Sequence, residues 1–128
     1  MNPEELRYHR DHSWVKTSGK RAVIGITDYA QNALGDIVYI DLPEVESLVD
    51  SGTELAEIES TKAMSSFIAP VSGTIVAVNE KLADSPEILN EDPYGQGWIV
   101  VVDMDDGAKL DELMGAGEYG RYIGEEAK

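Results

Sequence analysis

Short apolar runs rich in β-branched residues dominate the pattern of hydrophobic and polar positions along the chain. They predict strands at Arg21–Thr27, Ile37–Leu42, Leu55–Glu59 and Trp98–Val102. No apolar run reaches the roughly 18 residues that a membrane-crossing helix needs. The pattern therefore predicts a mainly β protein with short helices.

Helical signals are local. Asp28 is a candidate N-cap with Gln31 three residues later, and Gly35 suits the αL position at the C-terminal end of a helix. One further helical turn is expected after Ser85 and Pro86, because serine favours the N-cap and proline the first helical position. We expect both helices to flank the strands.

The C-terminal residues 107–128 have a helical composition. Helices are expected at 109–114 and 118–126, although four glycines weaken both. The whole chain of 128 residues fits one domain, because a domain of this size buries roughly two thirds of its unfolded surface. Residues 1–128 are therefore expected to form a single domain, with 107–128 as its C-terminal helical segment.

One strand-like segment occurs twice. The run Gly35–Asp41 reappears as Gly73–Asn79, at an offset of 38 residues (73 minus 35), with glycine, isoleucine and valine in register. Two copies are too few for a solenoid, which needs at least three units. The repeat instead predicts two related halves that form a sandwich with approximate two-fold symmetry.

Two strand-length runs between the repeated segments predict a β-hairpin. These runs are Thr53–Ser60 and Met64–Pro70, and they are separated by Thr61, Lys62 and Ala63. The connection lacks the Asn-Gly or Gly-X signal of a two-residue primed turn, so we expect a loop of three or four residues built on a type I turn. Lys62 would lie at its tip.

Charge makes Lys62 conspicuous. The chain has a net charge of −15, which disfavours binding to nucleic acids and anionic membranes and favours protein partners. Between Ala22 and Glu80 the only basic residue is Lys62, among ten acidic ones. Most such lysines are merely solvated. At a hairpin tip, however, Lys62 would be accessible to a modifying enzyme, and it lacks the burial or neighbouring cations that Schiff-base chemistry requires.

No other residues form a convincing catalytic or metal site. The chain has no cysteine, and its two histidines, His9 and His12, would point to opposite faces if the segment were a strand. A metal site needs three or four ligands, so a packing or surface role is favoured for both. Trp14 and Trp98 are expected to be core or interface aromatics.

The segment Glu59-Ser60-Thr61-Lys62-Ala63 resembles the lipoylation motif of the glycine cleavage H-protein family. Other segments resemble the family in the same order, and together they extend the resemblance from about Tyr8 to about Tyr122. They are Gly25–Gln31, Leu34–Val38, Leu42–Pro43, Ala69–Gly73, Asn90–Gly95 and Gly97–Trp98.

The resemblance implies a barrel-sandwich hybrid of two pseudo-symmetric antiparallel β halves with short flanking helices, the lipoyl/biotinyl-like fold. It implies that Lys62 carries a covalent lipoic acid as N6-lipoyllysine, and that Glu59 and Gly73 are recognised by a lipoate ligase or lipoyl transferase. The chain would then be a cytoplasmic, non-enzymatic carrier subunit.

The implied partners are those of glycine cleavage. A PLP-dependent glycine decarboxylase (P protein) loads the aminomethyl group of glycine onto the lipoyl arm. A tetrahydrofolate-dependent aminomethyltransferase (T protein) unloads it, and a dihydrolipoyl dehydrogenase (L protein) reoxidises the dithiol. The arm would shelter in a pocket near five residues that match family positions: Asp11, Ser13, Ile26, Ala63 and Ser66.

The chain departs from the family inside that pocket. Ser13 and Ser66 stand where the family usually has carboxylates, and Asp11, two residues from Ser13, would share its face of a strand and supply the charge. The losses leave an alternative open, namely a lipoylated paralogue that relays lipoyl groups to other proteins. Biotin carriage is disfavoured because Thr61 and Ala63 flank the lysine where biotinyl domains have methionines. A lipoyl domain of a 2-oxo-acid dehydrogenase would lack the segment from Asn90 to Trp98.

Overall fold

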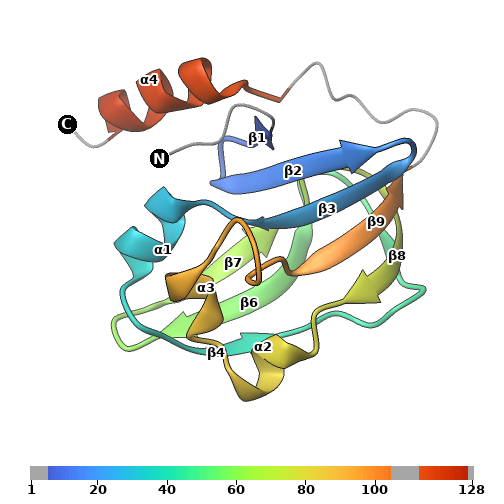
Figure 1. The fold of residues 1–128 in the computed structure, drawn as a ribbon, viewed down its shortest axis with the longest axis horizontal. Coiled ribbons are helices and arrows are strands. Elements are labelled where there is room, and N and C mark those ends of the chain that lie inside the picture. The colour runs from blue at the N-terminus through green and yellow to red at the C-terminus, as the bar shows by residue number, and fades with distance from the viewer. Residues whose placement is uncertain (1–5, 105–112, 127–128) are drawn as a thin grey trace.

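Two antiparallel sheets form the core of the protein in the computed structural model, which describes residues 6–104 and 113–126 (Figure 1). One sheet has six strands in the order β1-β2-β3-β9-β8-β5, and the other has three in the order β4-β6-β7. The strands are β1 (Arg7–Tyr8), β2 (Ser13–Ser18), β3 (Arg21–Ile26), β4 (Ile37–Asp41), β5 (Leu48–Val49), β6 (Glu54–Ser60), β7 (Met64–Ile68), β8 (Gly73–Val78) and β9 (Val100–Met104).

The repeated segments each supply one strand, and the two strands lie in different sheets. The first copy contains β4, which pairs antiparallel with β6, and the second contains β8, which pairs antiparallel with β9. The additional residues of the second half lie between β8 and β9 and form two short helices, α2 (Lys81–Asp84) and α3 (Ile88–Glu91). The prediction of two related β halves is therefore confirmed.

Helix α1 (Asp28–Leu34) is where the sequence predicts a helix, but its N-cap differs. Thr27 has extended backbone angles and its Oγ1 accepts a hydrogen bond from the Ala30 amide at 3.2 Å. Asp28 is the first helical residue, and its carboxylate accepts a hydrogen bond from Gln31 Nε2 at 2.8 Å. Assigning Asp28 as the N-cap was wrong by one residue. Gly35 ends the helix with a positive φ of 79° as expected, but its ψ of −152° lies outside the αL region that the sequence predicted.

The other helices also begin at positions that differ from the predictions. The residues after Ser85 first form a turn, in which the Ile88 amide donates to Ser85 O, so α3 begins only at Ile88 with Glu87 as its N-cap. Helix α4 spans Ala116–Glu126, two residues more than expected. Leu113 and Met114 are not helical, and Met114 instead forms a β-bridge with Tyr8. The rest of the expected helix, 109–112, lies outside the described residues, as does the start of the 107–128 segment.

Two apolar clusters hold these elements together. The larger one contains buried residues of both sheets, including Ile24, Ile58 and Val102, and each such side chain contributes roughly 1.5–3 kcal/mol on burial. The smaller one lies beneath α4, where the Tyr8 and Tyr119 rings stack with their centroids 4.7 Å apart. In the described part of the chain, no helix is long and apolar enough to cross a membrane.

Candidate functional site

Lys62 lies in a three-residue loop at the tip of the hairpin formed by β6 and β7, as the sequence predicts. Glu59 and Met64 form the last pair of the ladder, and the Ser60 amide donates to Ala63 O at 2.8 Å. The Ser60 hydroxyl accepts from the amides of Lys62 and Ala63 at 3.2 and 3.1 Å. No loop residue has a positive φ, which excludes a primed turn and agrees with the prediction.

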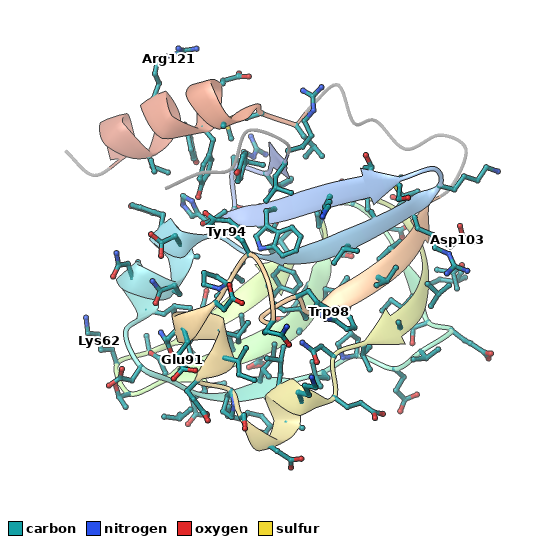
Figure 2. All side chains as sticks on the ribbon, in the orientation of Figure 1. Lys62, Glu91, Tyr94, Trp98, Asp103 and Arg121 are labelled. Carbon is teal, nitrogen blue, oxygen red and sulfur yellow. The ribbon has the colours of Figure 1, made fainter. Side chains whose placement is uncertain are left out.

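The Lys62 side chain is exposed at the margin of the molecule, beside the end of α1 (Figure 2). Its stem passes over Gly35, because a Cβ placed on that glycine would lie 3.2 Å from Lys62 Cε. The loop is also attached to the same segment by its backbone, since the Thr61 amide donates to Asp36 O at 3.0 Å. The lysine is therefore both accessible and held at its base.

Carboxylates on β4 and β6 share one face of the three-stranded sheet, and Glu59 is the one beside this tip. Glu59 pairs with Tyr39 on β4 and Met64 on β7, and all three are exposed. One step along the strands, Glu57 pairs with Asp41. Glu59 thus lies beside the loop, in a position that a modifying enzyme approaching Lys62 can reach.

Gly73 lies elsewhere. It is buried in β8, and a Cβ there would overlap the backbone oxygen of Asp103 and the Val102 side chain. Figure 2 shows Asp103 at the end of the molecule opposite Lys62. The sheet itself therefore requires a glycine at this position, and recognition of Gly73 by a modifying enzyme stays a prediction.

The structure brings only part of the expected pocket together. Ser13 and Ile26 are paired on β2 and β3 and both are buried. Ala63 and Ser66 are exposed on the hairpin, where the Ser66 hydroxyl donates to Glu54 Oε1 at 2.6 Å. Ser13 Oγ has no hydrogen-bond partner among the described residues, so it is the buried polar atom still open to a ligand.

Asp11 does not share a strand face with Ser13, because residues 9–12 form a turn. The His12 amide donates to His9 O and the His9 amide donates to Ser13 O, both at 2.9 Å, and His12 has a φ of 68°. The Asp11 carboxylate lies 3.2 Å from His9 Nδ1. The strand expected here was wrong, and so was the inference that it would direct Asp11 toward Ser13.

His12 packs against aromatic rings and His9 lies beside the exposed Asp11, in agreement with the packing or surface role expected for both. The His12 ring lies against Tyr29, and its Nδ1 is 2.7 Å from the Tyr119 hydroxyl. Burial is the largest influence on His9 and lowers its pKa, with a smaller opposing contribution from Asp11. Among the described residues, no three potential ligands lie close enough together to hold a metal ion.

Three polar residues that support the site were not assigned a role from the sequence. Asn90 hydrogen-bonds the segment beneath Lys62, and the Tyr94 hydroxyl accepts from the Asp28 amide at 2.9 Å. Burial raises the pKa of Tyr94. Thr27 Oγ1 lies 2.8 Å from the Tyr119 hydroxyl, which links α4 to the start of α1. Asn90 and Tyr94 belong to the motif Asn90–Gly95, so the family-like motif was the available signal.

Comparison with known proteins identifies the family. The family model described as "Glycine cleavage H-protein" matches residues 6–126. The glycine cleavage system H protein of Staphylococcus carnosus is 48% identical over 123 residues, covering 96% of this chain and 98% of the relative. That of Carboxydothermus hydrogenoformans is 46% identical over 126 residues, covering 98% and 97%.

A solved structure agrees in fold. The crystal structure of a glycine cleavage system H protein from Mycobacterium marinum has a TM-score of 0.85 and 37% identity, covering 98% of this chain and 99% of that one. The predicted fold class, a lipoyl-domain-like barrel-sandwich hybrid, is confirmed by this likeness and by the two antiparallel sheets. The chain belongs to the glycine cleavage H-protein family.

Proposed function

We propose that this chain is the lipoyl carrier of a glycine cleavage system, a non-enzymatic subunit that moves the aminomethyl group of glycine from the PLP-dependent decarboxylase to the tetrahydrofolate-dependent aminomethyltransferase. The observation that carries the proposal is Lys62, exposed at the tip of a hairpin and set in the family-like sequence Glu59–Ala63. The relatives' names do not favour the alternative, a protein that relays lipoyl groups.

The hairpin suits covalent attachment of lipoic acid. The Lys62 amine can reach an enclosing enzyme from the tip of the loop, while the ladder between Glu59 and Met64 keeps its backbone in place. In its neutral form the amine bonds through Nζ to the acyl carbon of an activated lipoyl donor, the bond from that carbon to the leaving group breaks, and the amine releases a proton. Once attached, the group supplies a long arm whose disulfide accepts the cargo.

The other proposed roles follow the family resemblance. Glu59 and Gly73 would be recognised by the lipoate ligase or lipoyl transferase, and the loaded arm would shelter near Asp11, Ser13, Ile26, Ala63 and Ser66. The exposed position of Glu59 beside the loop supports its part in recognition. The unpartnered hydroxyl of Ser13 supports a polar contact in the pocket. The P, T and L proteins would be the partners in the cycle.

Reconstitution tests the proposal. The lipoylated chain is combined with the decarboxylase, the aminomethyltransferase, the dehydrogenase, glycine, tetrahydrofolate and NAD, and carbon dioxide release is measured. We expect Lys62→Arg to abolish the activity, because the guanidinium does not accept the lipoyl group. The matched control Lys81→Arg, on the exposed surface of α2, should retain it. Activity that survives Lys62→Arg would refute the proposal.

The departure in the pocket can be tested in the same assay. Ser13→Glu and Ser66→Asp restore the carboxylates usual in the family and would pair with the cationic amine of the cargo. If carbon dioxide release with the wild-type chain is weak, we expect either substitution to raise it. If the wild-type chain is fully active and both variants reduce that activity, the carboxylates are not needed for this cargo.

A further inference from the structure

The base of Lys62 rests on the junction between α1 and β4, which we define as Gly35–Ile37. The lysine stem passes over Gly35, and the Thr61 amide donates to Asp36 O at 3.0 Å. Ile37 then pairs with Ser60 in the ladder between β4 and β6. Any movement of the α1–β4 junction would therefore move the loop that presents the lysine.

A single amide side chain holds the α1–β4 junction on both sides of Asp36. Asn90 Oδ1 accepts from the Ile37 amide at 2.9 Å, and Asn90 Nδ2 donates to Gly35 O at 2.8 Å. Because the Ile37 amide can only donate and the Gly35 carbonyl can only accept, these two partners determine which way the Asn90 amide points. The orientation is thus set by the backbone of the α1–β4 junction.

Asn90 is itself held on a separate element. It lies in α3 next to the fully buried Leu89, and its second Nδ2 hydrogen bond goes to Gln31 Oε1 at 3.0 Å. Gln31 in turn donates to Asp28 at the start of α1. The side chain therefore connects the insertion of the second half to both α1 and the α1–β4 junction.

We propose that Asn90 is a positioning residue for Lys62, and that it sets the rate at which the lysine is lipoylated. The inference rests on the proposed function of Lys62 as the attachment site. By holding Gly35 and Ile37, Asn90 fixes the Asp36 carbonyl that anchors Thr61. Lysine presentation depends on this anchor, because a small displacement of a reacting group lowers the rate steeply.

The test compares the full-length chain with Asn90→Ala, Asn90→Asp and the matched control Asn79→Ala. Asn79 is a buried asparagine whose Nδ2 also bridges two backbone oxygens, Gln96 O and Trp98 O, both at 2.8 Å, outside the α1–β4 junction. Asn90→Asp keeps the volume and the Oδ1 acceptor in case the alanine variant does not fold. Circular dichroism establishes that each variant is folded at the assay temperature.

Two readouts separate positioning from general stability. Amide hydrogen exchange should show lost protection at Thr61 in both Asn90 variants, although Thr61 does not contact Asn90 directly. The kcat/KM of lipoate ligase for the chain, with lipoate and ATP, should fall about tenfold in both variants. Asn79→Ala should change neither readout.

Three results would overturn the inference. Thr61 protection could persist in the Asn90 variants, their kcat/KM could equal that of the wild type, or Asn79→Ala could slow lipoylation equally. Failure of the proposed function looks different, because the wild-type chain itself would then gain no lipoyl mass. In that case the role of Asn90 in lipoylation is refuted together with the function.

Discussion

Gly35 and Gly73 begin the two copies of the repeated segment, yet the structure needs a glycine at each for a different reason. Gly35 ends α1 with a φ of 79° and a ψ of −152°, a backbone region almost restricted to glycine. Gly73 has no positive φ, but its Cα lies so close to β9 that a Cβ would overlap Asp103 O. In the first copy the glycine is required by the end of helix α1, and in the second it is required by the close approach of strand β9.

The surroundings of the two copies differ as well. In the first half, the cap at Gly35 creates a place for the Lys62 stem, and hydrogen bonds from Thr27 and Asn90 hold α1 at its two ends. In the second half, β8 pairs with β9 from its first residue, Gly73, and the chain between these two strands forms α2 and α3. The insertion in the second half thus supports the site in the first.

The largest effect is expected from Gly73→Ala. The added methyl group must displace both the β9 backbone at Asp103 and the Val102 side chain, so we expect a loss of about 3 kcal/mol in the free energy of unfolding. Urea unfolding measures it. A loss well below 1 kcal/mol would mean that the two strands separate easily and that the close approach is not what requires the glycine.

Gly35→Ala should cost less, about 2 kcal/mol, because the strain lies in the backbone and the nearest neighbour is the flexible stem of Lys62. The matched control is Gly19→Ala, which has a φ of 61° but nothing within 4 Å of the added Cβ. Urea unfolding should show a smaller loss for Gly19→Ala, and the Lys62 amide resonance should shift only in Gly35→Ala. Equal shifts would contradict the contact between Gly35 and Lys62.

Thr27→Val should reduce the free energy of unfolding by about 1 kcal/mol, because it removes the N-cap of α1 and keeps the side-chain shape. Asp28→Asn serves as the comparison, since the amide oxygen can still accept from Gln31. Thermal unfolding of the two variants shows whether Thr27 or Asp28 contributes more to the stability of the start of α1. A larger loss for Asp28→Asn would reinstate Asp28 as the main cap.

The smallest effect is expected from His9, which begins the turn that places His12 against Tyr29 of α1. Burial lowers the pKa of His9, so below about pH 6.5 the unfolded chain binds more protons at this residue than the folded one. Stability from this residue is therefore lost as the pH falls through the ordinary histidine range. His9→Asn should remove that part of the loss when thermal unfolding is compared at pH 7.5 and 5.5. An unchanged slope would contradict the burial effect.

The strands and the hairpin were predictable because their signals are local. Two apolar runs separated by three residues predict the loop around Lys62, and the structure confirms its length. The repeat of Gly35–Asp41 likewise predicted the two halves. In each case the spacing of apolar residues along the chain is enough to predict the element, and the residues that pack against it from elsewhere in the sequence need not be known.

The N-cap and the turn at His9–His12 were missed because distant residues decide them. Thr27 and Asp28 are both good caps, and Thr27 is favoured where its hydroxyl also meets Tyr119. The positive φ of His12 is costly in isolation, but the ring then packs against Tyr29 and Tyr119. The role of Asn90 could not be inferred either, since its partners lie 53 to 59 residues away.

Attachment of lipoic acid to Lys62 is tested by the intact mass of the chain after incubation with lipoate, ATP and lipoate ligase, followed by peptide mapping. We expect one added lipoyl group, located on Lys62 and absent in Lys62→Arg, while Lys81→Arg is modified like the wild type. No added mass, or a lipoyl group on any other lysine, would contradict it.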